Sequence, residues 1–309
     1  MSAAASPSLA ARLWTYQAER FPLGKTALLC AIFSAASVSV SAHLAGRAPP
    51  PPAAYLAAFV ITLAFFFQLR VLDEIKDGDD DARYRPERPI PRGLVRLSTI
   101  VRLGVASAAI ATLAALSVAP ALPLTLALAW LWMAAMTVEF FAPAWLKARP
   151  FAYLVSHMLV MPLIDFVVTG CEWLPHGAAP AGLWLFLALS FANGCVLEIG
   201  RKLWAPESER DGVETYSGLL GPARGALLWM GCVLVALALL LGVGVATRAP
   251  LVTGGIGGAA AVAVLAVAWR YRTAPTPKAA AAVEAAAGGW VFACYAAAGF
   301  APFARMAGL

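Results

Sequence analysis

Residues 53–72, AAYLAAFVITLAFFFQLRVL, decide the fold class of this chain. These twenty residues contain one charged side chain, Arg70, and as a helix they are long enough to cross the roughly 30 Å hydrocarbon core of a bilayer. Lipid offers the backbone no hydrogen-bond partners, so a spanning segment has to satisfy its own amide and carbonyl groups, as an α-helix does. The stretch therefore predicts a transmembrane helix.

Similar apolar segments recur along the whole chain. Of the 309 residues, 61% are hydrophobic and 13% are charged, whereas soluble domains have roughly 45–50% and about 25%. We therefore expect an all-α, polytopic membrane protein, a single domain over residues 1–309 with about nine transmembrane helices in one bundle. The predicted spans cover residues 24–46, 53–72, 98–118, 121–141, 151–171, 181–199, 224–246, 250–270 and 282–303.

The distribution of Lys and Arg predicts the orientation. When the connections are assigned alternately to two sides, 20 of the 23 basic residues fall on the side of the N-terminus, and Arg47, Arg248 and Arg305 fall on the other. Cytoplasmic connections carry an excess of Lys and Arg. We therefore expect a cytoplasmic N-terminus and a location in a bacterial inner membrane. Topology and anionic lipid explain the net charge of +6, so no nucleic-acid partner is expected.

The segment ahead of the first span has a mixed character. Residues 8–22, SLAARLWTYQAERFP, match a short amphipathic helix that lies at the membrane interface. A terminus without fixed structure is an equally good interpretation. The first interpretation predicts an interfacial helix within residues 1–22.

The connection directly after residues 53–72 is rich in acidic side chains. Seven of the 17 acids lie in it: Asp73, Glu74, Asp77, Asp79, Asp80, Asp81 and Glu87. If the helix continues, Asp73, Asp77 and Asp81 follow each other at four-residue intervals on one face, bordered by Glu74. Like charges at this spacing repel. A magnesium ion would relieve that repulsion, since it is typically held by one or two carboxylates and substrate phosphates.

Basic residues interleave with these acids, a pattern expected of a site that binds a metal and a diphosphate. The alternative is a solvated, charged loop that only enforces topology. The helical register and the position at the end of a span favour a site for Asp73, Glu74, Asp77 and Asp81. Asp79 and Asp80 lie off the main face, and for both of them the solvated loop is the better interpretation.

A second group of acids follows the span 181–199. Glu198 ends the span and precedes Arg201 and Lys202 by three and four residues, so a surface ion pair is the simple explanation of this trio. Acids beyond Pro206 are further candidates for a metal, without a clear register. They are Glu207, Glu209 and Asp211.

Other polar side chains lie inside or near the ends of apolar spans. They are Glu139, His157, Asp165 and Asn193. Charges at membrane depth usually face a cavity or a partner. Asp165 is predicted toward the far end of its span, within reach of the outer interface, and packing is the simpler role for His157. Between the fourth and fifth spans, Lys147 and Arg149 either clamp a phosphate or anchor the turn.

The acidic run resembles a motif of the UbiA superfamily of intramembrane prenyltransferases. The family pattern is Asn-Asp-x-x-Asp-x-x-x-Asp after the second span, followed by Arg-Pro-(Leu/Ile)-Pro-x-Gly. Here residues 73–81 read DEIKDGDDD and residues 88–93 read RPIPRG. The spacing is kept, with Asp73 in place of Asn and Glu74 in place of Asp. The nine-span topology matches as well, so the resemblance covers most of the chain.

Two other family motifs are matched more loosely. The second acidic motif, usually Asp-x-x-x-Asp after the sixth span, has Glu198 at its start but Lys202 where the next acid is expected. A run similar to Tyr-Pro-x-x-Lys-Arg between the fourth and fifth spans is represented by Pro143, Lys147 and Arg149. These departures leave open which acids bind a second metal.

The resemblance implies a Mg²⁺-dependent transfer of a prenyl group from a polyprenyl diphosphate to a small lipophilic or aromatic acceptor in the membrane. The catalytic residues would be Asp73, Glu74, Asp77 and Asp81. The metal ligands would be these four acids together with Glu198, Glu207 and Asp211. The diphosphate contacts would be Lys76, Arg88, Lys147, Arg149, Arg201 and Lys202.

Three other functions are consistent with parts of the sequence. A terpene cyclase would use the same fold, with the substrate's own double bond capturing the cation. An inactive UbiA-like scaffold is supported only by the irregular second motif. A membrane transporter fits less well, because transporters usually place ionisable groups near the midplane on broken helices within internal repeats, whereas these acids gather at one surface.

Overall fold

The computed structural model describes residues 7–210 and 212–306, with side chains as far as Phe303, and every regular element in these ranges is a helix. The bounds of the long helices are α2 (Leu23–Leu44), α3 (Pro52–Lys76), α5 (Leu97–Val118), α6 (Leu122–Thr137), α10 (Leu183–Arg201), α12 (Pro222–Ala246), α13 (Pro250–Thr273) and α14 (Pro277–Met306). A further span is divided into α8 (Pro150–Met158), α9 (Val160–Trp173) and the 3₁₀ helix η2 (Leu174–His176).

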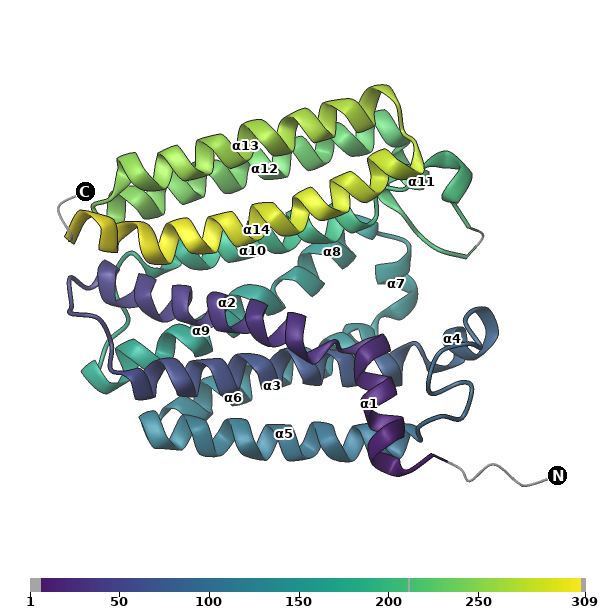
Figure 1. Cartoon of the computed structure of the whole chain (residues 1–309), viewed down its shortest axis with the longest axis horizontal. Coiled ribbons are helices and arrows are strands. Elements are labelled where there is room, and N and C mark those ends of the chain that lie inside the picture. The colour runs from purple at the N-terminus through teal and green to yellow at the C-terminus, as the bar shows by residue number, and fades with distance from the viewer. Residues whose placement is uncertain (1–6, 211, 307–309) are drawn as a thin grey trace.

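The predicted spans agree with these helices. Eight segments of the described chain are long and apolar enough to cross a membrane, and the broken segment Pro150–His176 is one of them. The shorter apolar helix α6, of 16 residues, lies among them (Figure 1). Together they give the predicted polytopic pattern of about nine spans.

The spans run side by side, and the last one packs against the first (Figure 1). The contact between α14 and α2 is very close at Gly299. A Cβ atom added there would lie 2.4 Å from the Cα of Ala36. Small residues allow helix backbones in membranes to approach this closely. Gly299 therefore lets the last span, α14, pack directly against the first span, α2.

The connections on the same side of the bundle as the N-terminus lie at one end of it, on the right of Figure 1. We call this end the acidic end. It carries the short elements α1 (Leu9–Arg20), α4 (Gly78–Tyr84), η1 (Glu139–Phe141), α7 (Pro143–Lys147), η3 (Pro206–Ser208) and α11 (Tyr216–Leu220). Helix α1 crosses the bundle direction (Figure 1), and Tyr16 packs with Val71, Val95 and Ile100. The N-terminal segment is therefore helical, as one of the two interpretations predicted.

One predicted span is broken in the structure. Helix α8 ends at Met158 and α9 begins at Val160. Pro162 has no amide hydrogen to donate to the carbonyl of Met158, and its ring crowds that turn. The break leaves His157 at the last turn of α8, close to the acidic end.

The prediction that Asp165 reaches the outer interface is wrong. Its side chain is fully buried, and it accepts hydrogen bonds from Ser37 at 2.7 Å and Tyr295 at 2.5 Å. The span continues well beyond Asp165 into η2. Near that end the buried carboxylate of Glu172 pairs with Arg47 at 2.8 Å.

Candidate active site at the acidic end

The acidic motif begins on the last turn of α3 and continues into α4. Helix α3 ends at Lys76, yet the amide of Asp77 donates to the carbonyl of Asp73 at 2.9 Å, and that of Asp81 to Asp77 at 2.8 Å. Backbone hydrogen bonds with four-residue spacing therefore continue from α3 into α4, although the backbone angles of Asp77 between them are not helical. Asp73, Asp77 and Asp81 are linked at four-residue intervals, but Asp73 is exposed whereas Asp81 is buried.

Asp73 and Asp77 form the open part of this motif. The side chain of Asp73 is 55% exposed and pairs with Arg70 at 3.2 Å. Arg201 of α10 and Asp77 both lie within electrostatic range of Asp73. Burial raises the pKa of Asp77, and the neighbouring Asp81 raises it further, while Lys76 and the guanidinium of Arg88 act in the opposite direction. Asp77 is thus crowded by the like charge of Asp81, whereas Asp73 has Asp77 and three cations, Arg70, Arg201 and Lys76, around it.

Glu74 and Asp81 are in a different situation, because both are paired with arginines. Glu74 is 3% exposed; Arg20 Nε lies 2.7 Å from it, and the Tyr16 hydroxyl donates to it at 3.4 Å. Asp81 is 4% exposed, with Arg88 Nη1 2.6 and 2.5 Å from its two oxygens and Arg20 Nη2 at 3.8 Å. We call the contacts of Arg20 with Glu74 and Asp81 the α1 latch, since they hold α1 against the motif.

Lys76 lies at the centre of a cluster of polar groups from three segments. Its Nζ atom is 2.5 Å from Glu139 Oε1, donates to the Tyr153 hydroxyl at 2.8 Å, and lies 3.5 Å from His157 Nε2. The rings of Tyr153 and His157 stack at 3.8 Å. Tyr153 was not predicted from the sequence, although its position four residues before His157 places both on one helix face.

Glu139 is held in this cluster by an unusual backbone. Glu139, Phe140 and Phe141 have φ angles of 50°, 51° and 59°. The left-handed region costs a residue with a side chain about 1–2 kcal/mol. Such conformations tend to concentrate at functional sites, and this one lies beside Lys76 of the acidic motif.

Glu198 brings α10 into the same region. It is buried, pairs with Lys202 at 3.0 Å and accepts a hydrogen bond from Arg201 Nε at 2.6 Å, so the ion pairs suggested by the sequence are present. Tyr153 and His157 lie within electrostatic range of Glu198. The ends of α3, α8 and α10 therefore converge on one polar region.

The other predicted residues lie outside this convergence or are used elsewhere. Glu207 on η3 is exposed. Glu209 accepts hydrogen bonds from Thr215 and Ser217 near the start of α11. Asp211 lies outside the described residues.

Two predicted phosphate contacts lie on α7 and just after it. Lys147 and Arg149 are both exposed. Arg149 stacks on Trp145, with its guanidinium carbon 4.6 Å from the ring centroid. The contacts of Arg149 thus favour an anchor for this turn, the second of the two roles considered for the pair.

The open carboxylates fit a magnesium ion. Among the residues the structure describes, no three His, Cys, Asp or Glu side chains are arranged to enclose a metal by themselves. Magnesium does not need such a cage, because it usually takes one or two carboxylates, substrate phosphates and water. Asp73 and Asp77 supply oxygen donors whose repulsion a cation would relieve. At Glu74 or Asp81 a cation would first have to displace an arginine.

Comparison with known proteins places this chain in a family. The model of the UbiA prenyltransferase family matches residues 31–292. No curated protein matches the chain by sequence.

Two solved structures share its fold. A structure from work on digeranylgeranylglyceryl phosphate synthase in membranes superposes with a TM-score of 0.64 at 13% identity, covering 93% of this chain and 99% of that one. The apo structure of a UbiA homolog from Aeropyrum pernix K1 gives a TM-score of 0.63 at 18% identity, covering 84% of this chain and 96% of that one. With its apolar helices and the family match over most of its length, this multi-pass membrane protein belongs to the UbiA prenyltransferase family.

Proposed function

We propose that this chain transfers a prenyl group from a polyprenyl diphosphate to a small lipophilic or aromatic acceptor in the membrane, and that the reaction depends on magnesium. The observation that carries the proposal is the convergence of Asp73, Asp77 and Lys76 with Arg201 at the end of an apolar bundle. Carboxylates for a metal and cations for phosphate oxygens are what a leaving diphosphate requires.

In this mechanism, the protein acts mainly on the leaving group. Negative charge builds on the diphosphate as its bond to the allylic carbon breaks, and the bonding electrons leave with the diphosphate. Cations fixed before the reaction stabilise that charge without having to reorganise. Lys76 is fixed by Glu139 and Tyr153, and Lys202 by Glu198. A magnesium ion held by Asp73 and Asp77 would supply further neutralising charge.

The apolar bundle has a second role in the proposal. The allylic cation left behind reacts with the acceptor, which forms the new carbon bond and then gives up a proton. Water would capture the same cation, so its exclusion by apolar side chains protects the reaction. This requirement fits a reaction at the end of a bundle whose spans are mainly apolar.

The proposed orientation puts the acidic end in the cytoplasm, in a bacterial inner membrane. Support comes from the 20 basic residues assigned to this side against 3 on the other. A soluble diphosphate head group would then reach the acids from the cytoplasm, while its tail stays in the membrane.

The test is to incubate the purified protein with magnesium, radiolabelled prenyl diphosphates of several chain lengths and a membrane lipid extract. We expect release of diphosphate together with a labelled prenylated acceptor, and loss of both on addition of EDTA. A labelled cyclic hydrocarbon would instead identify a terpene cyclase. Metal-independent binding of the prenyl diphosphate would contradict the proposed site.

A further inference from the structure

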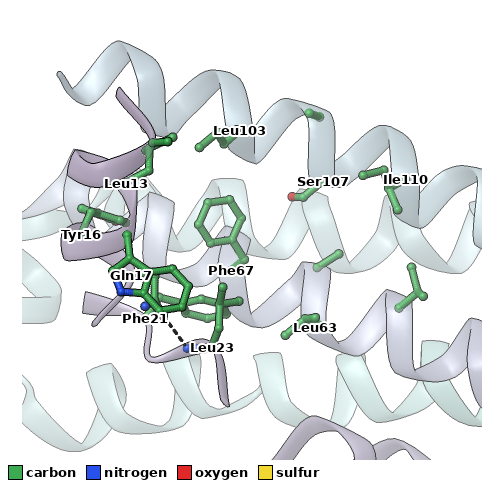
Figure 2. Close-up of a pocket in the computed structure, with 15 residues that line it drawn as sticks. Leu13, Tyr16, Gln17, Phe21, Leu23, Leu63, Phe67, Leu103, Ser107 and Ile110 are labelled. Atoms are coloured by element: carbon green, nitrogen blue, oxygen red, sulfur yellow. Dashed lines mark hydrogen bonds between the residues drawn. The ribbon is translucent and has the colours of Figure 1, made fainter. Parts of the chain in front are cut away.

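A groove with a volume of about 540 Å³ lies between α1, α3 and α5 (Figure 2). Figure 2 shows Leu13 and Tyr16 of α1 facing Phe67 of α3 and Leu103 of α5 across it. Gln17 also lines the groove, but its side-chain oxygen accepts the amide of Leu23 at 3.0 Å and is thus satisfied within the chain. The lining is therefore almost entirely apolar.

The groove opens on the outside of the bundle. Leu103, Ala106 and Ile110 of α5 line it and are exposed. Trp14, at the α1 side of the groove, is 70% exposed. Because α3 and α5 are apolar spans, this outer face meets the bilayer, and tryptophan is typical of its interface. An occupant of the groove would therefore come from the lipid.

Two arginines lie near the end of the groove that is next to the acidic motif. Arg12 lies one helical turn before Tyr16 on α1, and Arg70 lies one turn after Phe67 on α3. The Nε atoms of both arginines are buried and have no hydrogen-bond partner in the described part of the chain. Arg70 is within electrostatic range of Tyr16, which lines the groove. Arg70 Nη1 also pairs with the exposed Asp73 at 3.2 Å, and the nearby Glu74 is paired with Arg20.

We propose that this groove binds an anionic phospholipid, with an acyl chain along the apolar lining and the phosphate near Arg12 and Arg70. Burial of the acyl chain supplies affinity for any phospholipid. The cations supply the preference for anionic head groups, at about fivefold for each Lys or Arg near the charged lipid. The bound lipid fills the space beneath α1, so it supports the position in which Arg20 reaches Glu74.

Native mass spectrometry of the full-length protein, in detergent with equal amounts of phosphatidylglycerol and phosphatidylcholine carrying the same acyl chains, tests the proposal. We expect one tightly retained phosphatidylglycerol. Ala106 lines the groove from an exposed position on α5, so Ala106→Phe should lower that occupancy at least about fivefold. Ala109 is exposed on the same helix outside the groove, so Ala109→Phe should leave the occupancy unchanged. Equal retention of both lipids by the wild type would overturn the proposal.

A second pair of variants tests the charge. Arg12→Gln should reduce the preference for phosphatidylglycerol about fivefold. Arg272 on α13 also has a buried Nε without a partner but lies outside the groove, so Arg272→Gln is the matched control and should keep the preference. An equal loss in both variants would show attraction to the general surface charge and would contradict a site under α1.

An optical measurement keeps the proposal testable if Ala106→Phe fails to fold. Phosphatidylglycerol with brominated acyl chains should quench Trp14, measured as the difference between the wild type and Trp14→Phe. An excess of ordinary phosphatidylglycerol should reverse this quenching, and an excess of phosphatidylcholine should not. Quenching of Trp14 that both lipids reverse equally would contradict the proposal.

Discussion

Two adjacent acids, Asp73 and Glu74, belong to the same motif but have opposite environments. Asp73 is 55% exposed and lies near Asp77 and Arg201, whereas Glu74 is 3% exposed and paired with Arg20. A helix turns by about 100° per residue, so neighbouring side chains face different surroundings. One face of α3 therefore presents acids to a ligand, while the adjacent face holds α1 in place.

Asp81 combines the two situations. It follows Asp77 by four residues, as Asp77 follows Asp73, but its buried carboxylate contacts Arg88 and Arg20. Movement of these arginines would therefore affect both the latch and the acidic face.

The largest effect is expected at Asp73 and Asp77, the open part of the motif. Asp77→Asn should lower magnesium-dependent diphosphate release by on the order of 10²–10³-fold, because a ligand of the charge-neutralising group is lost. The thermal midpoint should be unchanged or slightly higher, since the substitution removes a carboxylate crowded by Asp81. Release assays and thermal melts on the same preparation check both. Wild-type turnover would refute the role of Asp77.

Asp81→Asn should reduce both turnover and stability. It removes the charge that pairs with Arg88 and lies near Arg20, and an unpaired buried group costs about 1–3 kcal/mol. The same release assay and a thermal melt measure these losses. Unchanged stability with full loss of turnover would show that Asp81 acts in the reaction with Asp73 and Asp77 and does not help to hold α1.

Glu74→Gln should lower the thermal midpoint with little change in magnesium affinity. Arg20 loses a charged partner at 2.7 Å, which is expected to cost about 1–3 kcal/mol. The control is Arg92→Gln, which breaks the exposed pair of Arg92 with Glu19 and should leave the midpoint nearly unchanged. A midpoint of Glu74→Gln equal to that of the control would refute the latch.

Lys76→Met should weaken binding of a non-hydrolysable prenyl diphosphate analogue about tenfold, the size expected for one charged hydrogen bond. Lys147→Met is the comparison. Lys147 is exposed, so this variant should change binding less. Calorimetric titration measures both. A larger loss for Lys147→Met would move the diphosphate toward α7.

The smallest effect is expected at Glu207. This acid is exposed on η3. Glu207→Gln should change diphosphate release less than about twofold, as surface substitutions usually do. A tenfold loss would restore Glu207 as a metal ligand.

The spans and the acidic face could be predicted from the sequence because both depend on local patterns. Apolar length fixes the helices, and a four-residue interval fixes the face of Asp73 and Asp77. The latch could not be predicted in the same way, since Arg20 and Glu74 are 54 residues apart and meet only when α1 packs on α3. The position of Glu139 depends on a left-handed backbone at residues 139–141, where the sequence EFF contains no glycine or asparagine that would predict it.

Magnesium titration in the presence of a prenyl diphosphate analogue, followed by calorimetry on wild type, Asp77→Asn and Glu74→Gln, tests the division of the motif most directly. We expect Asp77→Asn to lose most of the magnesium affinity and Glu74→Gln to keep it within about twofold. Equal losses in the two variants would contradict the assignment of one helix face to the ligand and the other to α1.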